Sequence, residues 1–351
     1  MNARENNSYD FVRFWAASAV LFSHQFALSG LPEPAVPCYG EDFGKLAVEI
    51  FFCLSGFLIC KSLQKSADWA EFVSARFLRI FPNLGFSLTA TSIGTMVWYH
   101  NYEHAWKHLK FILGNLLMFF RGVTYRVPGI FEDAKGGSAV NGPLWSLPSE
   151  LWLYVLLFLF FVAGGRRSGL FILVGAILLS VLWGLTPILG DFSFGPFDSL
   201  QFPRLGSYFL SGALVATCWD RIRPHAIAMG LIAAVAMLAA RSLLPVNTIL
   251  QSMLLAMVVI CLGSSNLMAW FSKGGDASYG MYIFAWPIQQ VCLLRIESFW
   301  ASMAVAFVVT TILGYATWHS FEKRVMSWRG SAAAGLRKAV GRVTGAERGM
   351  A

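Results

Sequence analysis

Charged residues and cysteines are both scarce in this chain. Asp, Glu, Lys and Arg together make up only 13% of its 351 residues, whereas roughly 25% is usual for a soluble domain. The six cysteines lack the close pairing that is typical of zinc ligands, so we expect buried, unreactive thiols and no metal site. DNA- and RNA-binding motifs are absent from the sequence as well. These shortages argue against a soluble protein, a metalloenzyme and a nucleic-acid-binding protein.

Hydrophobic residues, by contrast, account for 56% of the chain and are gathered in long runs. A helix needs about 17–25 apolar residues to cross a lipid bilayer. Runs of this kind lie near 9–29, 43–62, 82–99, 144–163, 169–188, 202–218, 225–243, 247–263, 277–295 and 299–320. The pattern predicts an all-α polytopic membrane protein with about ten transmembrane helices in the lipid bilayer.

The distribution of lysine and arginine predicts the orientation. A further apolar stretch at 108–120 is short and contains Lys110. If it does not span and the N-terminus is cytoplasmic, the cytoplasmic segments hold 17 Lys and Arg and the outer segments hold nine, as the positive-inside rule favours. Both termini are then cytoplasmic, and residues 100–143 form a large outer loop with a short helix or re-entrant segment. Residues 1–325 form the transmembrane domain, and residues 326–351 form a basic cytoplasmic tail that is disordered or bound to a surface.

The first predicted span contains two ionisable residues, Arg13 and His24. Such groups are costly inside a bilayer, so they indicate a functional site. His24 lies near the outer end and could act as a general base toward a hydroxyl group, or it could be a core histidine that hydrogen-bonds a neighbour. Glu49 and Glu150 enter their spans from the same side and could orient the imidazole. The alternative for each acid is to neutralise an arginine, such as Arg13, Arg121, Arg126 or Arg204.

Arg76 and Arg79 follow the second predicted span and share one face of a helix, because they lie three residues apart. Such a pair can hold phosphate oxygens, or it can simply keep the loop on the cytoplasmic side. Pro82 is expected at the head of the next span. Trp145 and Tyr279 could stack on a sugar, with an interfacial aromatic role as the alternative.

Four sequence blocks, in this order, resemble the acyltransferase 3 family of integral membrane acyltransferases over nearly the whole chain. Asp10-x-x-Arg13 followed by His24 is similar to the family's opening helix. The run from Glu49 to Ile59 is similar to its apolar block, and Arg76-x-x-Arg79-Ile80-x-Pro82 is similar to its arginine motif. The fourth block is Trp145-Ser146-Leu147-x-x-Glu150 with Tyr154, reinforced by Ser278-Tyr279-Gly280-Met281-Tyr282 and by Trp286-Pro287.

The resemblance implies a multi-pass O-acyltransferase of the bacterial inner membrane. Such an enzyme moves an acyl group, commonly acetyl from acetyl-CoA, to a hydroxyl group of a surface glycan such as an exopolysaccharide or a lipopolysaccharide. No permanently bound cofactor is implied, because acyl-CoA is the donor substrate. The expected partners are acyl-CoA, the glycan acceptor and the lipid bilayer, and glycan-export or assembly machinery would be a further partner.

The resemblance also assigns roles to residues of this chain. It implies that His24 is catalytic, and Glu150 and Glu49 are the acids expected beside it. Acyl-CoA binding is expected at Arg76, Arg79 and Arg13. Substrate binding is expected at Trp145, Ser146 and Tyr279.

The chain departs from the family pattern at three positions, one of which is Glu49, where the family often has aspartate. Leu151 stands where the family often has a second acid, and Ala285 stands where it often has a histidine, so we expect no catalytic role at either position. The rival interpretation is a transporter or flippase for a lipid-linked sugar or a polysaccharide. Intramembrane Arg, His and Glu would serve transport equally well, but a transporter would need no acyl-CoA.

Overall fold

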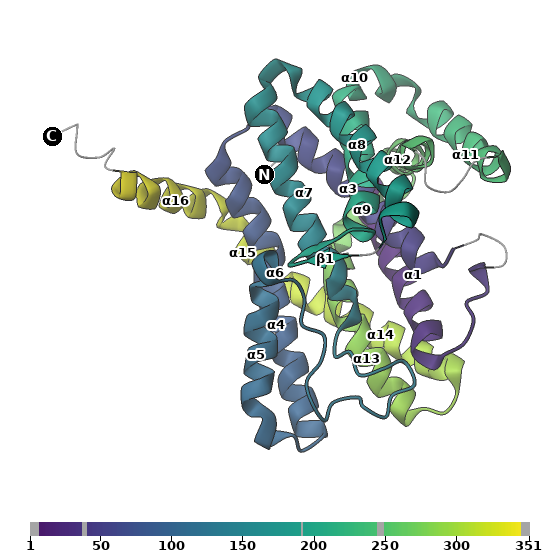
Figure 1. The fold of residues 1–351 in the computed structure, drawn as a ribbon, viewed down its shortest axis with the longest axis vertical. Helices are drawn as coiled ribbons and strands as arrows, with labels where there is room; N and C mark the ends of the chain where they lie inside the picture. The colour runs from purple at the N-terminus through teal and green to yellow at the C-terminus, as the bar shows by residue number, and fades with distance from the viewer. Residues whose placement is uncertain (1–6, 37–40, 191, 244–248, 345–351) are drawn as a thin grey trace.

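We describe the protein from a computed structural model, which covers residues 7–36, 41–190, 192–243 and 249–344. Helices dominate these residues, and each of the ten predicted spans is a helix (Figure 1). These helices are α1 (Tyr9–Ser29), α3 (Phe43–Lys65), α4 (Trp69–Trp98), α7 (Ser146–Gly164), α8 (Ser168–Leu189), α9 (Gln201–Thr217), α11 (Ala226–Leu243), α12 (Ile249–Gly263), α13 (Ser278–Arg295) and α14 (Phe299–Thr317).

Within the described residues, four stretches are long and apolar enough to cross a membrane. They are Phe43–Lys65, Gly142–Leu189, Trp219–Ala240 and Phe299–Ser327. The fold is therefore that of a largely α-helical membrane protein, as predicted. The count of ten crossings and the cytoplasmic location of the termini stay predictions.

Shorter elements connect these helices. The predicted short helix of the 100–143 loop is α5 (Ala105–Leu116), which runs back beside α4 (Figure 1). The other short elements are α6 (Met118–Arg121), the hairpin of β1 (Ser193–Phe194) and β2 (Phe197–Asp198), α10 (Trp219–Ile222), α15 (Lys323–Ser327) and α16 (Arg329–Thr344). A π-helical turn at Trp318–Glu322 joins α14 to α15.

The start of α4 differs from the expectation that Pro82 heads a span. The helix already begins at Trp69, because Asp68 caps it by accepting a hydrogen bond from the Glu71 backbone N–H at 2.8 Å. Pro82 lies inside α4, where neighbouring helices can compensate for the backbone hydrogen bond that proline cannot make. Arg76 and Arg79 are consequently fixed on a continuous helix rather than in a loop.

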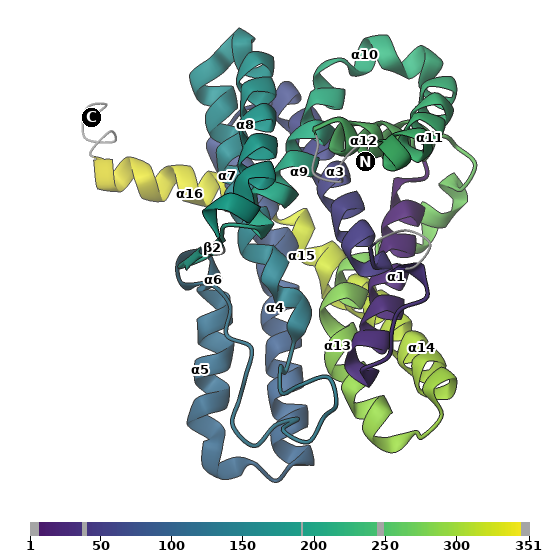
Figure 2. The same ribbon diagram turned by 45° about the vertical axis from the view of Figure 1, so that its right-hand side comes forward.

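Helices α1 and α13 pack side by side, as Figure 2 shows, and α13 also contacts α4. Arg13 of α1 donates a hydrogen bond to Asp276, just before the start of α13. Gln25, near the end of α1, accepts a hydrogen bond from Gln289 of α13 at 2.8 Å. On α4, the carbonyl of Ile80 accepts a hydrogen bond from Tyr279 at 3.0 Å. The starts of α1 and α13 therefore lie together, beside the part of α4 around Arg79 and Ile80.

Helices α3 and α9 pack so closely that two glycines are required. A Cβ at Gly56 would lie 1.8 Å from the carbonyl oxygen of Phe209, and a Cβ at Gly212 would lie 2.0 Å from that of Cys53. No side chain fits at these distances, so the two backbones touch.

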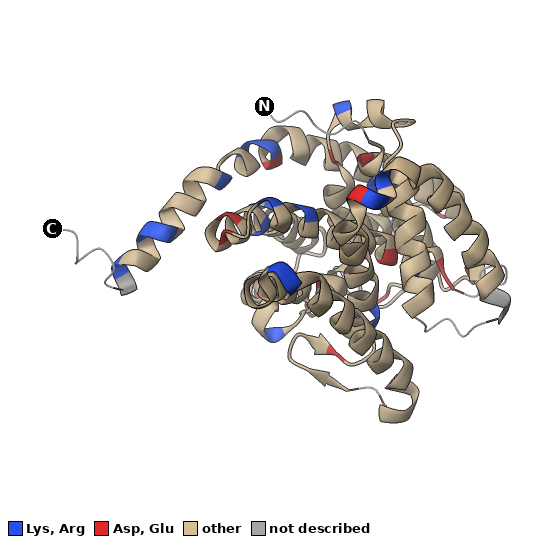
Figure 3. Ribbon diagram, turned by 90° about the horizontal axis from the view of Figure 1, so that it is seen from above, with Lys and Arg blue, Asp and Glu red and all other residues tan. Residues whose placement is uncertain are grey.

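The predicted tail begins as ordered structure. Residues 329–344 form α16, which extends away from the helix bundle and carries several of its basic residues along its length (Figure 3). The helix packs against α4, so the surface-bound alternative describes this part of the tail. Residues 345–351 lie outside the described part of the chain.

Cysteine burial follows the prediction at Cys53, Cys60, Cys261 and Cys292. Cys218 is exposed instead, because it follows the last residue of α9 at the edge of the bundle. Cys38 lies outside the described residues. In the described part of the chain, no group of three His, Cys, Asp or Glu side chains is arranged to hold a metal ion.

Candidate active site

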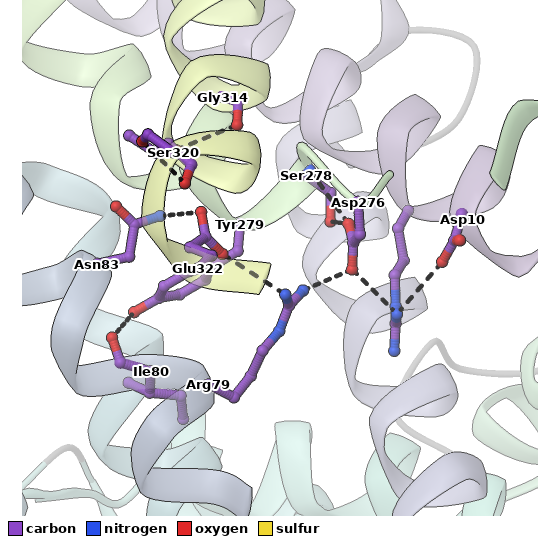
Figure 4. Close-up of polar contacts among 12 residues, drawn as sticks. Asp10, Arg79, Ile80, Asn83, Asp276, Ser278, Tyr279, Gly314, Ser320 and Glu322 are labelled. Carbon is purple, nitrogen blue, oxygen red and sulfur yellow. Dashed lines mark hydrogen bonds and ion pairs between the residues drawn. The ribbon is translucent and has the colours of Figure 1, made fainter. Parts of the chain in front are cut away.

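An ion-pair cluster lies where the starts of α1 and α13 meet the part of α4 that contains Arg79 (Figure 4). Asp276, in the loop before α13, lies 3.2 Å from Arg13 and 2.5 Å from Arg79. Its other carboxylate oxygen accepts hydrogen bonds from the backbone and the hydroxyl of Ser278, at 3.2 and 2.5 Å. Arg79 also lies 3.6 Å from Glu322, which accepts a 2.6 Å hydrogen bond from Asn83.

The ion-pair cluster keeps the carboxylate of Asp276 ionised. Burial alone raises the pKa of Asp276, but the guanidinium groups of Arg79 and Arg13 and the hydrogen bonds from Ser278 outweigh burial and hold the pKa well below its ordinary value. Arg79 is held from its other sides by the ring faces of Tyr279 and Trp318, at 5.8 and 5.7 Å. The charge of Arg79 is therefore already neutralised within the protein.

Arg76, one turn before Arg79, has very different surroundings. Its guanidinium carbon lies 5.9 Å from the centre of the Tyr154 ring, and its Nε atom is buried without a hydrogen-bond partner among the described residues. It also forms no ion pair with any described residue. Of the predicted arginine pair, Arg76 is therefore the one whose charge is available for a ligand.

Three cavities meet at Arg76. The wide cavity, of about 840 Å³, lies between α3, α4, α10 and the start of α16. The middle cavity, of about 450 Å³, lies beside the ion-pair cluster and is also lined by Arg13 and Arg79. The narrow cavity, of about 100 Å³, reaches inward to Glu150. Arg76 lines all three, so the cavities adjoin one another at this side chain, and we refer to them together as the cavity path.

Polar groups surround the inner end of this path. Glu150 accepts a hydrogen bond from the Ser55 hydroxyl at 3.0 Å and another from the Tyr154 hydroxyl. Opposite them, the hydroxyl groups of Ser146 and Tyr282 lie 2.7 Å apart. The narrow cavity thus offers a carboxylate and several hydroxyl groups beside one unpaired guanidinium.

The residues expected to bind substrate are only partly brought together. Ser146 and Tyr279 line the narrow cavity with Arg13, Arg76 and Arg79. Trp145 packs against the hydrophobic core instead, and it lines none of the three cavities. Trp145 belongs to a short helical turn, and the orientation of this turn is set by the packing of its buried residue Leu144.

His24, on α1, lies outside the narrow cavity. It contacts a part of α13 that is further from the start of that helix than Tyr279 and Tyr282. Its ring meets the Trp286 ring edge-on, with 4.9 Å between centroids, and its Nδ1 atom is buried without a hydrogen-bond partner among the described residues. Tyr279, Tyr282 and Trp286 follow one face of α13, so Trp286 is about 10 Å along the helix from Tyr279. His24 is therefore next to the cavity path along α13 and does not line it.

Residues 139–142 contact the tryptophan that His24 touches. The carbonyl oxygen of Ala139 accepts hydrogen bonds from Trp286 at 2.8 Å and from Gln290 at 2.7 Å. Gly142 passes so close that a Cβ there would lie 3.0 Å from the Trp286 ring. The loop residues 139–142 thus hold the aromatic ring that His24 contacts.

Neither acid expected beside His24 is paired with it. Glu49 lies 3.6 Å from Arg204, so the alternative of arginine neutralisation is confirmed for this residue. Glu150 takes its partners from α3 and α7, as described above, and forms no ion pair with a described arginine. Equal depth in the membrane predicted the pairing with His24, but depth does not determine which side of a helix faces which neighbour.

Three residues of this region were not predicted from the sequence. Asp276 and Glu322 were not expected in the ion-pair cluster, and Tyr282 was not expected to line a cavity. Asp276 has a recognisable signal, because an Asp two residues before a Ser at the start of an apolar run is typical of a helix beginning. Glu322 has none, since it lies in a π-helical turn that brings it back to α4. Ser55 was assigned no role from the sequence, but its hydroxyl donates a hydrogen bond to Glu150.

Comparison with known proteins gives two kinds of match. The family model described as "Acyltransferase domain" matches residues 6–319. An O-acetyl transferase of Shigella phage Sf6 is 29% identical over 346 residues, which cover 92% of this chain and 97% of that protein. Nodulation protein 10 of Rhizobium leguminosarum bv. viciae is 28% identical over 228 residues, which cover 62% of this chain and 61% of that protein. No solved structure matches.

Proposed function

The chain belongs to the acyltransferase 3 family, and from this premise we propose that it transfers an acyl group from acyl-CoA to a hydroxyl group of a glycan. That the chain is an acyltransferase follows from the family and from its O-acetyl transferase relative. The donor, the acceptor and the residue roles below are the proposal. The observation that carries it is that Arg76, which has no ion-pair partner among the described residues, lines all three cavities.

The donor side of the proposal rests on charge and size. Acyl-CoA has an anionic nucleotide and a long neutral arm that ends in the thioester. In this proposal the nucleotide occupies the wide cavity. Arg76 binds its phosphate groups or the polar arm, and the arm extends toward the narrow cavity. A space of about 100 Å³ near Glu150 suits a short acyl group, so acetyl is the acyl group we propose.

The acceptor side rests on His24. A buried ring nitrogen without a protein partner can accept a hydrogen bond from a substrate hydroxyl group. In the proposed reaction His24 removes the proton as the hydroxyl oxygen attacks the thioester carbon. The new carbon–oxygen bond forms while the carbon–sulfur bond breaks, and the proton passes to the CoA thiolate. The acceptor hydroxyl belongs to a cell-surface or secreted glycan, made at a bacterial inner membrane that the helices cross repeatedly.

Glu150 has a separate role in this scheme. Its carboxylate and the Ser146–Tyr282 hydroxyl pair line the narrow cavity together with Arg76. They orient the polar arm and the thioester, and Tyr279 forms part of the same wall. Glu49, bound to Arg204, supports the packing of α3 on α9. The transporter alternative gains no observation of its own, whereas the family match favours acyl transfer.

The test is the O-acyl content of surface and secreted glycans, measured by NMR before any alkaline treatment. The strains compared are a deletion, the deletion complemented with wild type, and the deletion complemented with His24→Ala at equal expression. We expect an O-acyl signal that is lost on deletion, restored by wild type and absent with His24→Ala. His225→Ala, which removes an exposed histidine, serves as the matched control and should restore the signal.

Two outcomes would contradict the proposal. Identical acylation in the deletion and the wild type would mean that the acceptor is not a glycan of this kind. Loss of the glycan itself from the cell surface on deletion would favour the transporter alternative. Normal acylation with His24→Ala would remove His24 from the catalytic role and leave the acyltransferase assignment in place.

A further inference from the structure

The wide cavity is strongly basic. Five of its lining residues are cationic and two are acidic; the cations are Lys61, Lys65, Arg76, Arg223 and Arg329, and the acids are Glu71 and Asp220. Both acids have other contacts. Glu71 lies 3.7 Å from Arg337, outside the cavity lining, and the side chain of Asp220 is 97% exposed and 4.0 Å from Lys61. The cavity therefore has an excess of positive charge, which attracts an anion.

Most of the cavity lining comes from four separate parts of the chain. Residues 61–66 end α3, residues 71–76 begin α4, residues 219–223 follow α9, and residues 329–330 begin α16. The distribution of Lys and Arg assigns all four parts to the cytoplasmic side. An anion that arrives from the cytoplasm would reach this cavity before the middle and narrow cavities.

The tail helix contributes directly to the cavity. Arg329, the first residue of α16, lines both the wide and the middle cavity, and no described residue forms an ion pair with it. Aromatic side chains, including Phe72 and Trp219, line the same space. A cationic rim with aromatic walls matches a nucleotide that carries several phosphate groups, because the phosphates need cations and the base needs an apolar face.

A latch holds α16 in this position. Arg337, two turns after Arg329, donates a hydrogen bond to Asp68 at 2.7 Å. Asp68 is also the residue that caps the start of α4. Ala333, between the two arginines on the sequence, is almost completely buried. The latch therefore fastens α16 to the same end of α4 that contributes Glu71, Phe72 and Arg76 to the cavity.

We propose that α16 is part of the donor site, with Arg329 binding a phosphate group of the nucleotide end of CoA and Arg337 positioning it through Asp68. The inference rests on the proposed function, because it takes CoA as the carrier of the acyl group. It assigns the basic tail a role in substrate recognition in place of a purely topological one. The acyl end then points along the path toward the narrow cavity.

The test is direct binding of CoA to the full-length protein in lipid nanodiscs, measured by isothermal titration calorimetry. Removing one charge-assisted phosphate contact should weaken binding about 10-fold or more, so this is the result expected for Arg329→Ala. Arg329→Lys should recover part of the affinity. Lys338→Ala is the matched control, because Lys338 is an exposed cation of the same helix that lines none of the three cavities; it should bind CoA as wild type does.

Arg337→Ala tests the positioning role. It should weaken CoA binding although Arg337 lines no cavity, and Arg337→Lys should restore most of the affinity because it can still reach Asp68. If Arg329→Ala binds CoA as tightly as wild type, or if Lys338→Ala loses the same affinity, the inference about α16 is overturned and the proposed function stands. If the wild-type protein itself does not bind CoA, the proposed donor is wrong and the inference falls with it.

Discussion

The ion-pair cluster and the wide cavity both gather cations at the same end of the molecule, but their cations have opposite surroundings. In the ion-pair cluster, Arg13 and Arg79 share Asp276, and Arg79 also reaches Glu322. In the wide cavity, cations outnumber acids, and Arg76 has no ion-pair partner among the described residues. The first arrangement joins helices, whereas the second leaves charge for a ligand.

Arg76 and Arg79 show this difference between paired and unpaired cations on a single helix. They are one turn of α4 apart, yet Arg79 is held between two carboxylates and two aromatic rings, while Arg76 faces three cavities. A buried charge is tolerated only when it is paired or when it binds a ligand. The presence of arginine in a membrane helix therefore identifies an important position without saying which of these two roles it has.

The largest effect is expected from Arg79→Ala. This change leaves Asp276 and Glu322 buried with too little positive charge, and breaking a buried pair in this way costs about 3–5 kcal/mol. We expect a strongly lowered unfolding temperature and a poor yield of monodisperse protein, measured by differential scanning fluorimetry and size-exclusion chromatography. Arg76→Ala is the matched variant and should unfold close to wild type. Equal destabilisation by both variants would erase the distinction between the two regions.

Arg76→Ala should instead impair use of the donor. Loss of one charge-assisted contact is worth about 1.5–3 kcal/mol, so the apparent KM for acetyl-CoA should rise about 10- to 100-fold. The measurement is release of free CoA thiol by the protein in nanodiscs, with the acceptor glycan held at a fixed concentration. An unchanged KM in a well-folded Arg76→Ala variant would contradict donor binding at this residue.

Two glutamates extend the same comparison. Glu150→Gln removes a carboxylate that lines the narrow cavity, and we expect turnover to fall about 10-fold with little change in unfolding temperature. Glu49→Gln removes the partner of Arg204, so it should lower stability by roughly 1–3 kcal/mol while the activity of the folded fraction is preserved. Reversed results, with Glu49→Gln inactive and Glu150→Gln merely unstable, would show that the roles have been exchanged.

The smallest effect concerns the latch of α16 and its dependence on pH. The hydrogen bond from Arg337, followed by that from the Glu71 backbone, holds the pKa of Asp68 below its ordinary value. Because the folded pKa is lowered, the latch is fully formed above about pH 4, the region of the unfolded pKa, and is lost as the pH falls through the lower folded pKa. The contribution is small because the pair is exposed.

Spin labels at Val73 on α4 and Ala339 on α16 can follow the latch by pulsed electron resonance. We expect a narrow distance distribution at pH 5–7 that broadens below about pH 4, where Asp68 takes up a proton. Arg337→Ala should give the broad distribution at every pH. A distribution in the wild type that is insensitive both to acid and to this substitution would mean that other contacts hold α16.

Much of the helical framework could be predicted from the sequence. Each apolar run of sufficient length became a helix, because backbone groups in lipid must be hydrogen-bonded within their own segment. The order of motifs also indicated the family, which the match over residues 6–319 confirms. The start of α4 at Trp69 was not predicted. The helix begins after the capping residue Asp68 in a polar stretch, before the hydrophobic run from which the span was predicted.

The pairing of charged residues could not be predicted in the same way. Glu49 and Glu150 were correctly identified as buried or half-buried acids in helices, but their partners are Arg204, Ser55 and Tyr154 rather than His24. Which residues meet depends on how each helix is rotated and on close contacts such as that between Gly56 and Phe209. Periodicity along one helix contains no information about the rotation of the next.

The sequence by itself determined that this chain is helical, lipid-embedded and an acyltransferase, because apolar length, charge distribution and ordered motifs are properties of the chain alone. Only the tertiary structure decided that Arg79 is neutralised by Asp276 and Glu322 while Arg76 is not. It also decided that the tail returns to the helix bundle, so that Arg329 lines the same cavity as Arg76. The physical reason is that the cost of burying a charge is set by what surrounds it, and those surroundings come from helices far apart in the sequence.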